Sequence, residues 1–178
     1  MTQPQLSDEL LGWARMAQYD TLDHDGETVL RARGRGEYRI QLRPSNRIAL
    51  LEIDDDGGEH EVLFASDLTV IERFLVGVLG DDVRDDLELD YLPIPWRKTD
   101  LAHGFELSGM VRGYRTLSRV GAGPVAASRD ETLSLVRLVP LSQFLTITFD
   151  ELKQSFLHAD GAPLLDGQHY SHRHHRRK

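Results

Sequence analysis

The stretch EYRIQLRPSNRIALLEIDDDGGEHEVLFASDLTVIERFLVGVLG, residues 37–80, decides the fold. Apolar and polar side chains alternate through Glu37–Ala65, as they do in half-buried strands, and turn-forming residues interrupt the alternation twice. The expected strands are Glu37–Arg43, Arg47–Ile53 and Glu59–Ala65. Apolar residues at helical spacing follow, with Ser66 as the expected N-cap and Gly80 as the expected left-handed C-cap. The stretch therefore predicts an antiparallel meander that runs into one helix.

The same order of elements returns later in the chain, at Gly104–Leu157. Strands are expected at Phe105–Met110, Tyr114–Val120 and Thr132–Val139, with a glycine-rich loop before the last of them. Thr148 and Glu151 have the spacing of a capping box, which predicts the start of a helix. Another helix, capped by Ser7, precedes the first meander. We therefore expect an α+β fold of antiparallel strands with packed helices, in two similar strand-meander-plus-helix halves.

These halves are expected to share a single domain over residues 1–167. The first half covers residues 1–80 and the second covers residues 104–165, and an acidic join at residues 81–103 connects them. Residues 168–178 contain four basic residues, four histidines and no acid. This composition predicts a basic, His-rich, disordered tail.

Charge and composition limit the classes of partner. The formal net charge is −8, and residues 1–167 alone carry 17 bases against 29 acids, a net −12. Such a body is expected to repel nucleic acid and to attract a basic protein. The chain has no cysteine, no apolar run long enough for a membrane span, and no signal-peptide pattern at its start. We therefore expect a cytoplasmic protein that binds neither nucleic acid nor membrane.

Motifs that carry chemistry are missing from both halves. Neither half contains a phosphate-binding glycine loop, a nucleophile elbow or a ligand cluster at metal spacing. The histidines have no serine or aspartate at a diagnostic spacing. We therefore expect no catalytic residue, no cofactor and no metal, and a protein that binds another protein.

Four segments carry a resemblance to a known family: Glu72–Leu75, Gly80–Arg84, Gly104–Leu107 and Ser142–Leu165. Together they resemble the actinobacterial, chiefly mycobacterial, immunity proteins of polymorphic toxin systems, a group that includes the immunity factor for tuberculosis necrotizing toxin. The similarity begins at about Trp13 and covers most of the chain. It implies an inhibitor that binds its cognate toxin, a secreted NAD(P) glycohydrolase (NADase), in a one-to-one complex. It also implies that the inhibitor blocks the NAD site in the producing cell until the toxin is secreted.

Two exposed segments are the candidate toxin contacts. The first is a hairpin tip formed by Asp54, Asp55, Asp56 and Gly57, and the second is the small, apolar-poor segment Gly121–Asp130. Loops carry recognition when the scaffold is devoted to packing. The contact residues expected in the second segment are Gly121, Ala122, Gly123 and Arg129.

Each candidate surface also has a purely structural interpretation. The residues of the Asp54–Gly58 tip are those that a tight turn requires, whatever they bind. The acids between Asp81 and Asp90 are typical of a solvated surface. The arginines between Arg31 and Arg47 could bind an acidic partner, or could form the solvent face of an amphipathic sheet. Trp96 could anchor a partner or fill the gap between the halves.

Two other functions share these features. A chaperone-like binding protein for a secreted effector would have the same acidic charge and the same lack of catalytic motifs. A small-molecule enzyme or sensor is the third reading, because catalytic groups assemble in space and not in sequence.

Overall fold

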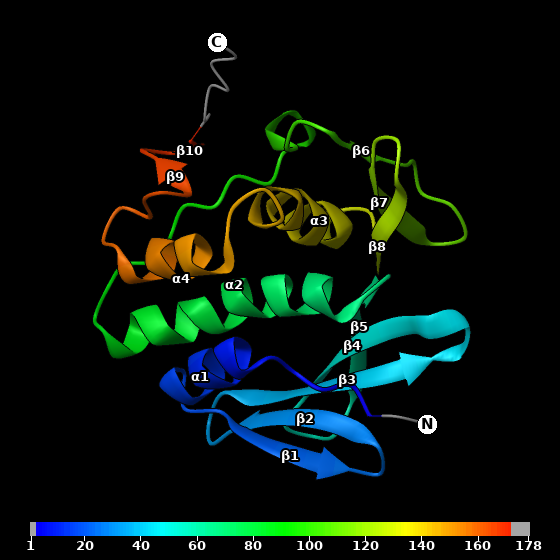
Figure 1. Ribbon diagram of the computed structural model, residues 1–178, viewed down its shortest axis with the longest axis vertical. Coiled ribbons are helices and arrows are strands. Elements are labelled where there is room, and N and C mark those ends of the chain that lie inside the picture. The colour runs from blue at the N-terminus through cyan, green and yellow to red at the C-terminus, as the bar shows by residue number, and fades with distance from the viewer. Residues whose placement is uncertain (1–2, 172–178) are drawn as a thin grey trace.

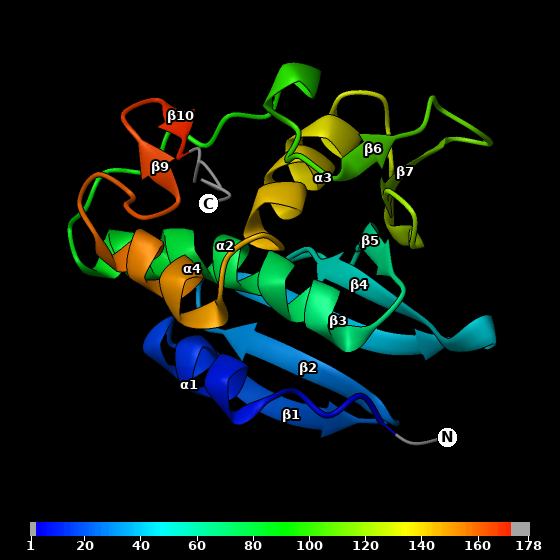
Figure 2. The same ribbon diagram turned by 45° about the horizontal axis from the view of Figure 1, so that its top comes forward.

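The computed structural model describes residues 3–171 as one large antiparallel sheet with helices on one of its faces, and a small two-stranded sheet near the C-terminal end of that range (Figures 1 and 2). The eight strands lie in the order β1-β2-β3-β4-β5-β8-β7-β6. The strands are β1 (Asp20–His24), β2 (Glu27–Ala32), β3 (Gly36–Arg43), β4 (Arg47–Ile53), β5 (Glu59–Ala65), β6 (Phe105–Leu107), β7 (Tyr114–Arg119) and β8 (Gly123–Arg129). The helices are α1 (Asp8–Met16), α2 (Leu68–Asp86), α3 (Leu133–Phe144) and α4 (Phe149–Leu157). The α+β prediction is thus confirmed.

Two meanders join to make this sheet. The first consists of β1–β5 and leads into α2, and the second consists of β6–β8 and leads into α3. They meet where β5 pairs with β8, in the register Phe64↔Ala127 and Ala65↔Ala126. Because the strands of the two halves hydrogen-bond to each other, both halves share one hydrophobic core.

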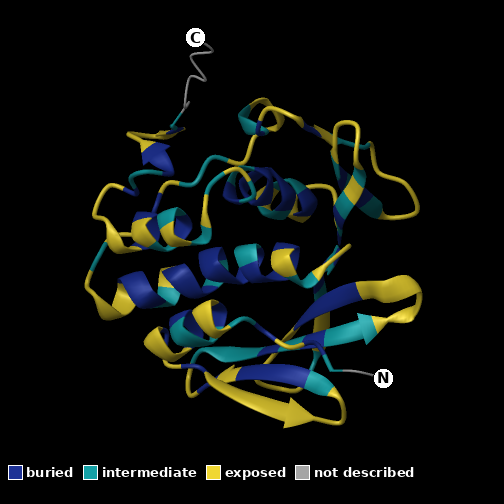
Figure 3. Ribbon diagram, in the orientation of Figure 1, coloured by how far each residue is buried: buried dark blue, intermediate teal, exposed yellow. Residues whose placement is uncertain are grey.

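Helix α2 runs through the middle of the molecule and is buried along most of its length (Figure 3). Its N-cap is Asp67, whose side chain accepts from the Val70 amide at 3.2 Å, so the Ser66 prediction is off by one residue. The prediction that Gly80 ends this helix is wrong, because the helix continues to Asp86. Gly80 instead gives the Phe156 ring of α4 room to approach, since an added Cβ would lie 2.5 Å from the Phe156 Cγ atom.

Helix α3 occupies the segment where the Thr132–Val139 strand was expected, so that prediction is wrong. Apolar residues in this segment also recur at helical spacing, and Ser134, Leu138 and Leu141 form one buried face. The Asp130 carboxylate accepts from the backbone amides of Thr132 and Leu133 at 2.9 Å, which favours a helix start. The third strand of the meander is β8, which begins at Gly123, ten residues before α3.

Arg84 connects the end of α2 to the last residues of α4 and the chain that follows them. Its side chain is completely buried and donates to the backbone carbonyls of Asp90, Phe156, His158 and Ala159 at 2.6–3.0 Å. These bonds satisfy the buried guanidinium without a carboxylate partner. Part of the expected acidic join is therefore the last turns of α2, held in the core by one arginine.

The start of the expected tail is ordered. His169–Tyr170 forms β10, which pairs with β9 (Leu165–Asp166), and the Tyr170 hydroxyl donates to the Pro95 carbonyl at 2.5 Å. The disorder prediction is wrong for these two residues because the Tyr170 ring is buried. Residues 172–178 lie outside the described part of the chain. Trp96 lies beside α2 and α3 but is 43% exposed, so it covers the gap between the halves only in part.

Candidate functional site

The β4–β5 hairpin ends in an exposed, acidic tip. Backbone hydrogen bonds of 2.9 Å join the Asp54 amide to the Gly58 carbonyl and the Gly57 amide to the Asp54 carbonyl. Gly57 has φ +85°, a left-handed conformation that favours glycine. The Asp54 carboxylate contacts the His60 imidazole at 2.5 Å. The tip is therefore a fixed turn, as the sequence indicates.

Asp55 and Asp56 are the free charges of this tip. Both residues are exposed, and neither forms an ion pair within residues 3–171. Asp56 accepts only a 3.3 Å hydrogen bond from the Gly58 amide. Two uncompensated carboxylates on a turn of fixed shape can approach a basic surface without first breaking an ion pair.

The second candidate segment, Gly121–Asp130, is mostly strand and not a flexible loop. Gly123–Arg129 is β8, and only the short turn that contains Gly121 and Ala122 connects it to β7. The Ala122 amide donates to the Arg119 carbonyl at 3.0 Å and closes this turn. Small side chains suit β8 because it pairs with β5 on one side and β7 on the other. The sequence offered a glycine-rich loop signal but no sign of this double pairing.

The eight candidate contact residues divide between opposite ends of the sheet. β5 and β8 are antiparallel, so the end of β8 lies toward the start of β5 and toward the hairpin tip. Arg129 accordingly lies beside Glu61, at 3.4 Å, and its Nε donates to the Tyr114 hydroxyl at 2.7 Å. The turn at Gly121–Gly123 lies at the other end of the strand. The structure thus groups Arg129 with Asp54–Gly57 and separates it from Gly121–Gly123.

Part of the arginine-rich face is paired internally. Arg31 and Arg39 both bind Glu37, at 2.5 and 2.7 Å, and Arg39 also binds Glu59 at 3.2 Å. Burial alone would raise the pKa of Glu37, but hydrogen bonds from these two arginines lower it below its ordinary value. The side chains cover an apolar strip on the sheet face away from the helices. The members of that strip are Val29, Ala49, Leu51 and Ile53. This geometry agrees with the solvent-face interpretation.

Arg35 belongs to a different cluster, at the end of α2. It binds Asp86 at 2.5 Å and approaches Asp82 and Asp85 at 3.8 and 3.9 Å. Hydrogen bonding from Arg35 lowers the pKa of Asp86 below its ordinary value. These acids therefore fasten the β2–β3 turn to α2. No group of three or more metal-ligating side chains occurs within residues 3–171.

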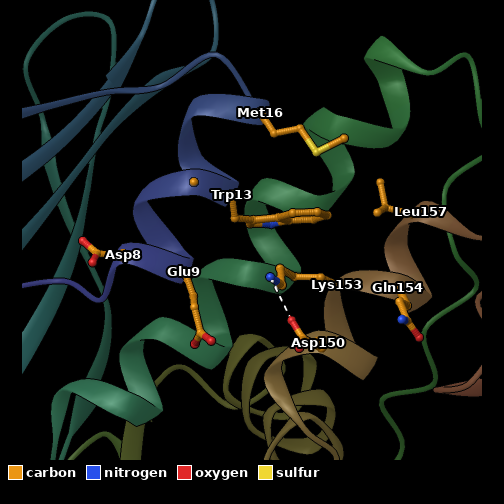
Figure 4. Close-up of a pocket in the computed structure, with 9 residues that line it drawn as sticks. Asp8, Glu9, Trp13, Met16, Asp150, Lys153, Gln154 and Leu157 are labelled. Atoms are coloured by element: carbon orange, nitrogen blue, oxygen red, sulfur yellow. Dashed lines mark ion pairs between the residues drawn. The ribbon is translucent and has the colours of Figure 1, made fainter.

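A groove lies between α1 and α4 (Figure 4). The Trp13 indole lies across it and donates to the Val76 carbonyl of α2 at 3.1 Å. Met16 and Leu157 line one end, and the Asp150–Lys153 ion pair of 3.1 Å lines the other. The hollow is about 400 Å³. Asp150 and Lys153 pair with each other, and the residues that line the groove include no serine, threonine, cysteine or histidine.

The histidines of the described chain form no catalytic triad. His60 contacts Asp54 and His158 contacts Asp160, each at 2.5 Å. No serine hydroxyl hydrogen-bonds to either imidazole within the described residues. No helix in that part of the chain combines the length and apolarity needed to cross a membrane.

Comparisons with known proteins extend these observations. The chain is similar to the immunity factor for TNT of Mycobacterium tuberculosis strain H37Rv and to its homolog in Mycobacterium bovis BCG. Each is 28% identical over 166 residues, which cover 89% of this chain and 92% of the relative. The solved structure of Rv3902c from M. tuberculosis matches with a TM-score of 0.79 at 27% identity, over 89% of this chain and 92% of that one.

The family match agrees with the extent of the resemblance found in the sequence. The model of the family Immunity protein 61 matches residues 13–164. Since this match covers most of the chain, the protein belongs to the immunity protein 61 family.

Proposed function

We propose that this protein is a cytoplasmic inhibitor that binds a secreted NAD(P) glycohydrolase toxin in a one-to-one complex and covers its NAD cleft. Family membership carries the proposal, because relatives that match over 89% of the chain are named immunity factors for TNT. The acidic body supports it further, since opposite charge speeds the encounter of two proteins. Inhibition by occlusion requires no chemistry from the inhibitor.

The hairpin tip at Asp54–Gly57 is the proposed leading contact. It projects from the sheet as the turn between β4 and β5, and its fixed backbone limits the entropy lost on binding. Arg129 lies toward the same end of the sheet and extends the contact. Gly121, Ala122 and Gly123 form a separate proposed contact at the opposite end.

A double substitution, Asp55→Ser with Asp56→Ser, tests the charge of the tip and leaves the Asp54–His60 contact intact. Exposed charges act mainly on the encounter, so the association rate should fall and its salt dependence should flatten. The matched control is Asp23→Ser in β1 with Asp25→Ser in the β1–β2 turn, which removes the same charge at the sheet edge. Surface plasmon resonance at several salt concentrations measures both rates. Equal effects of the two variants would show that only net charge matters and that the tip is not a contact.

The state of the toxin distinguishes inhibition from chaperone-like binding. An inhibitor leaves the toxin folded and inactive, and removal of the inhibitor restores activity. A chaperone-like protein would raise the solubility of its client without inhibiting it. The far-ultraviolet circular dichroism and NADase activity of the purified complex distinguish the two.

A further inference from the structure

A second hollow, about 250 Å³, lies between α2 and α3 beside the segment that contains Trp96. The α2 side chains in its wall are Phe74, Val78 and Asp81, and those from α3 are Val136, Arg137, Pro140 and Phe144. Apolar surface dominates this wall. We call this hollow the Trp96 pocket.

The mouth of the Trp96 pocket exposes apolar surface to water. Trp96 is 43% exposed and Val136 is 39% exposed, although Phe74 and Pro140 beneath them are buried. Exposed tryptophan beside a preformed hollow is typical of a binding surface, because tryptophan is enriched where partners contribute most binding energy.

Asp81 is the one acidic side chain among the described residues that line this pocket. It forms no hydrogen bond or ion pair within residues 3–171. The nearby Arg84 guanidinium is occupied by four backbone carbonyls. Arg137, whose side chain also lines the pocket, donates to the Ser128 hydroxyl at 3.2 Å. The pocket therefore holds a carboxylate that no cation within residues 3–171 pairs with.

The surroundings of this carboxylate disfavour its charge. Asp81 is exposed, yet partial desolvation by the surrounding chain is the main cause that raises its pKa to about 6; the adjacent Asp82 contributes to this rise and Arg84 opposes it. A cation brought into the pocket would relieve this cost by pairing with the carboxylate. An apolar wall suits a hydrocarbon stem, and an indole face attracts a positive charge.

We propose that the Trp96 pocket accepts one lysine or arginine side chain of the toxin, with its stem against Trp96 and Val136 and its charge at Asp81. The identity of the partner rests on the proposed function, whereas the chemistry of the pocket rests on its own geometry. This basic side chain would then anchor the complex at a second contact, separate from the hairpin tip.

A small probe tests the chemistry without any toxin. n-Butylguanidinium reproduces the end of an arginine side chain, and n-butanol is its neutral control. In ¹H–¹⁵N spectra the Trp96 indole signal should shift and saturate with n-butylguanidinium at concentrations on the order of 10 mM. The Trp13 indole is the internal reference, since it is buried and bonded to the Val76 carbonyl. Equal shifts with n-butanol, or no shift of the Trp96 signal, would overturn the proposal.

Titration calorimetry with the toxin tests the assignment to the complex. Asp81→Asn and Trp96→Ala should each weaken the affinity at least tenfold, whereas Trp96→Phe should retain most of it. Asp23→Asn on the far edge strand is the matched control for charge and should bind as the wild type does. Tight binding by Asp81→Asn would overturn the proposal. If the wild type itself fails to bind the toxin, the proposed function fails, and the probe alone decides whether the pocket accepts a cation.

Discussion

Replacing Gly80 with alanine should destabilise the protein, although alanine is the better helix former. In an open helix interior the change would stabilise by about 1 kcal/mol. Here the new Cβ would lie 2.5 Å from Phe156 Cγ and 2.9 Å from Phe156 Cε1. Phe156 is 1% exposed and packs edge-on against Phe144 with the ring centroids 6.2 Å apart, so the ring has no free space to enter. Overpacking of this kind costs about 1–3 kcal/mol.

Urea denaturation measures this change against two controls. Gly12→Ala lies in α1 with only the Arg15 Nη2 atom nearby, at 3.9 Å, and should stabilise by up to about 1 kcal/mol. Gly77→Ala would meet the Phe144 ring at 2.5 Å and should destabilise as Gly80→Ala does. If Gly80→Ala is as stable as the wild type, α4 does not pack against α2 as described.

Three further predictions concern a cap, the chain end and pH. Thr148→Ala should lower stability by about 1 kcal/mol because it removes the side-chain cap of α4, and an unchanged urea midpoint would contradict this. Truncation after Ser171 should leave the urea midpoint unchanged. Truncation after Gly167 should lower the free energy of unfolding by roughly 2 kcal/mol, because it removes the buried Tyr170. Equal midpoints for the two truncated proteins would show that Tyr170 contributes nothing to stability. Desolvation raises the pKa of Asp81 from its ordinary value of 3.8 to about 6 in the folded protein. Between pH 4 and 6 the folded protein therefore binds more protons than the unfolded chain, and the contribution of Asp81 to stability falls as the pH rises. The Tm of Asp81→Asn should therefore increase relative to that of the wild type from pH 4 to 7. Parallel curves of Tm against pH would refute the pKa shift.

The parts of the fold that local pattern determines were predictable. Alternation gave β3, β4 and β5 almost residue by residue, and the Thr148–Glu151 capping box marks the start of α4 as expected. Both signals depend on neighbours within a few residues, so they need no knowledge of the rest of the chain.

The parts that tertiary contacts determine were not predictable. A glycine near the end of an apolar helix suits a C-cap, but Gly80 is needed because an aromatic ring from α4 lies against it. The apolar residues of Leu133–Val139 fit both strand and helix periodicity. Because β8 already pairs with both β5 and β7, no place beside β7 remains for this segment as a strand, and it forms a helix. The wall of the Trp96 pocket likewise comes from α2 and α3, which are far apart in sequence.

Titration of NADase activity tests the central claim most directly. A fixed concentration of the toxin, well above the dissociation constant, is mixed with increasing amounts of this protein, and NAD hydrolysis is measured. The account predicts a linear fall to zero activity at one molar equivalent, slower inhibition when NAD is present beforehand, and no hydrolysis by the inhibitor alone. Full activity at an excess of folded protein, or inhibition that NAD does not oppose, would contradict occlusion of the NAD cleft.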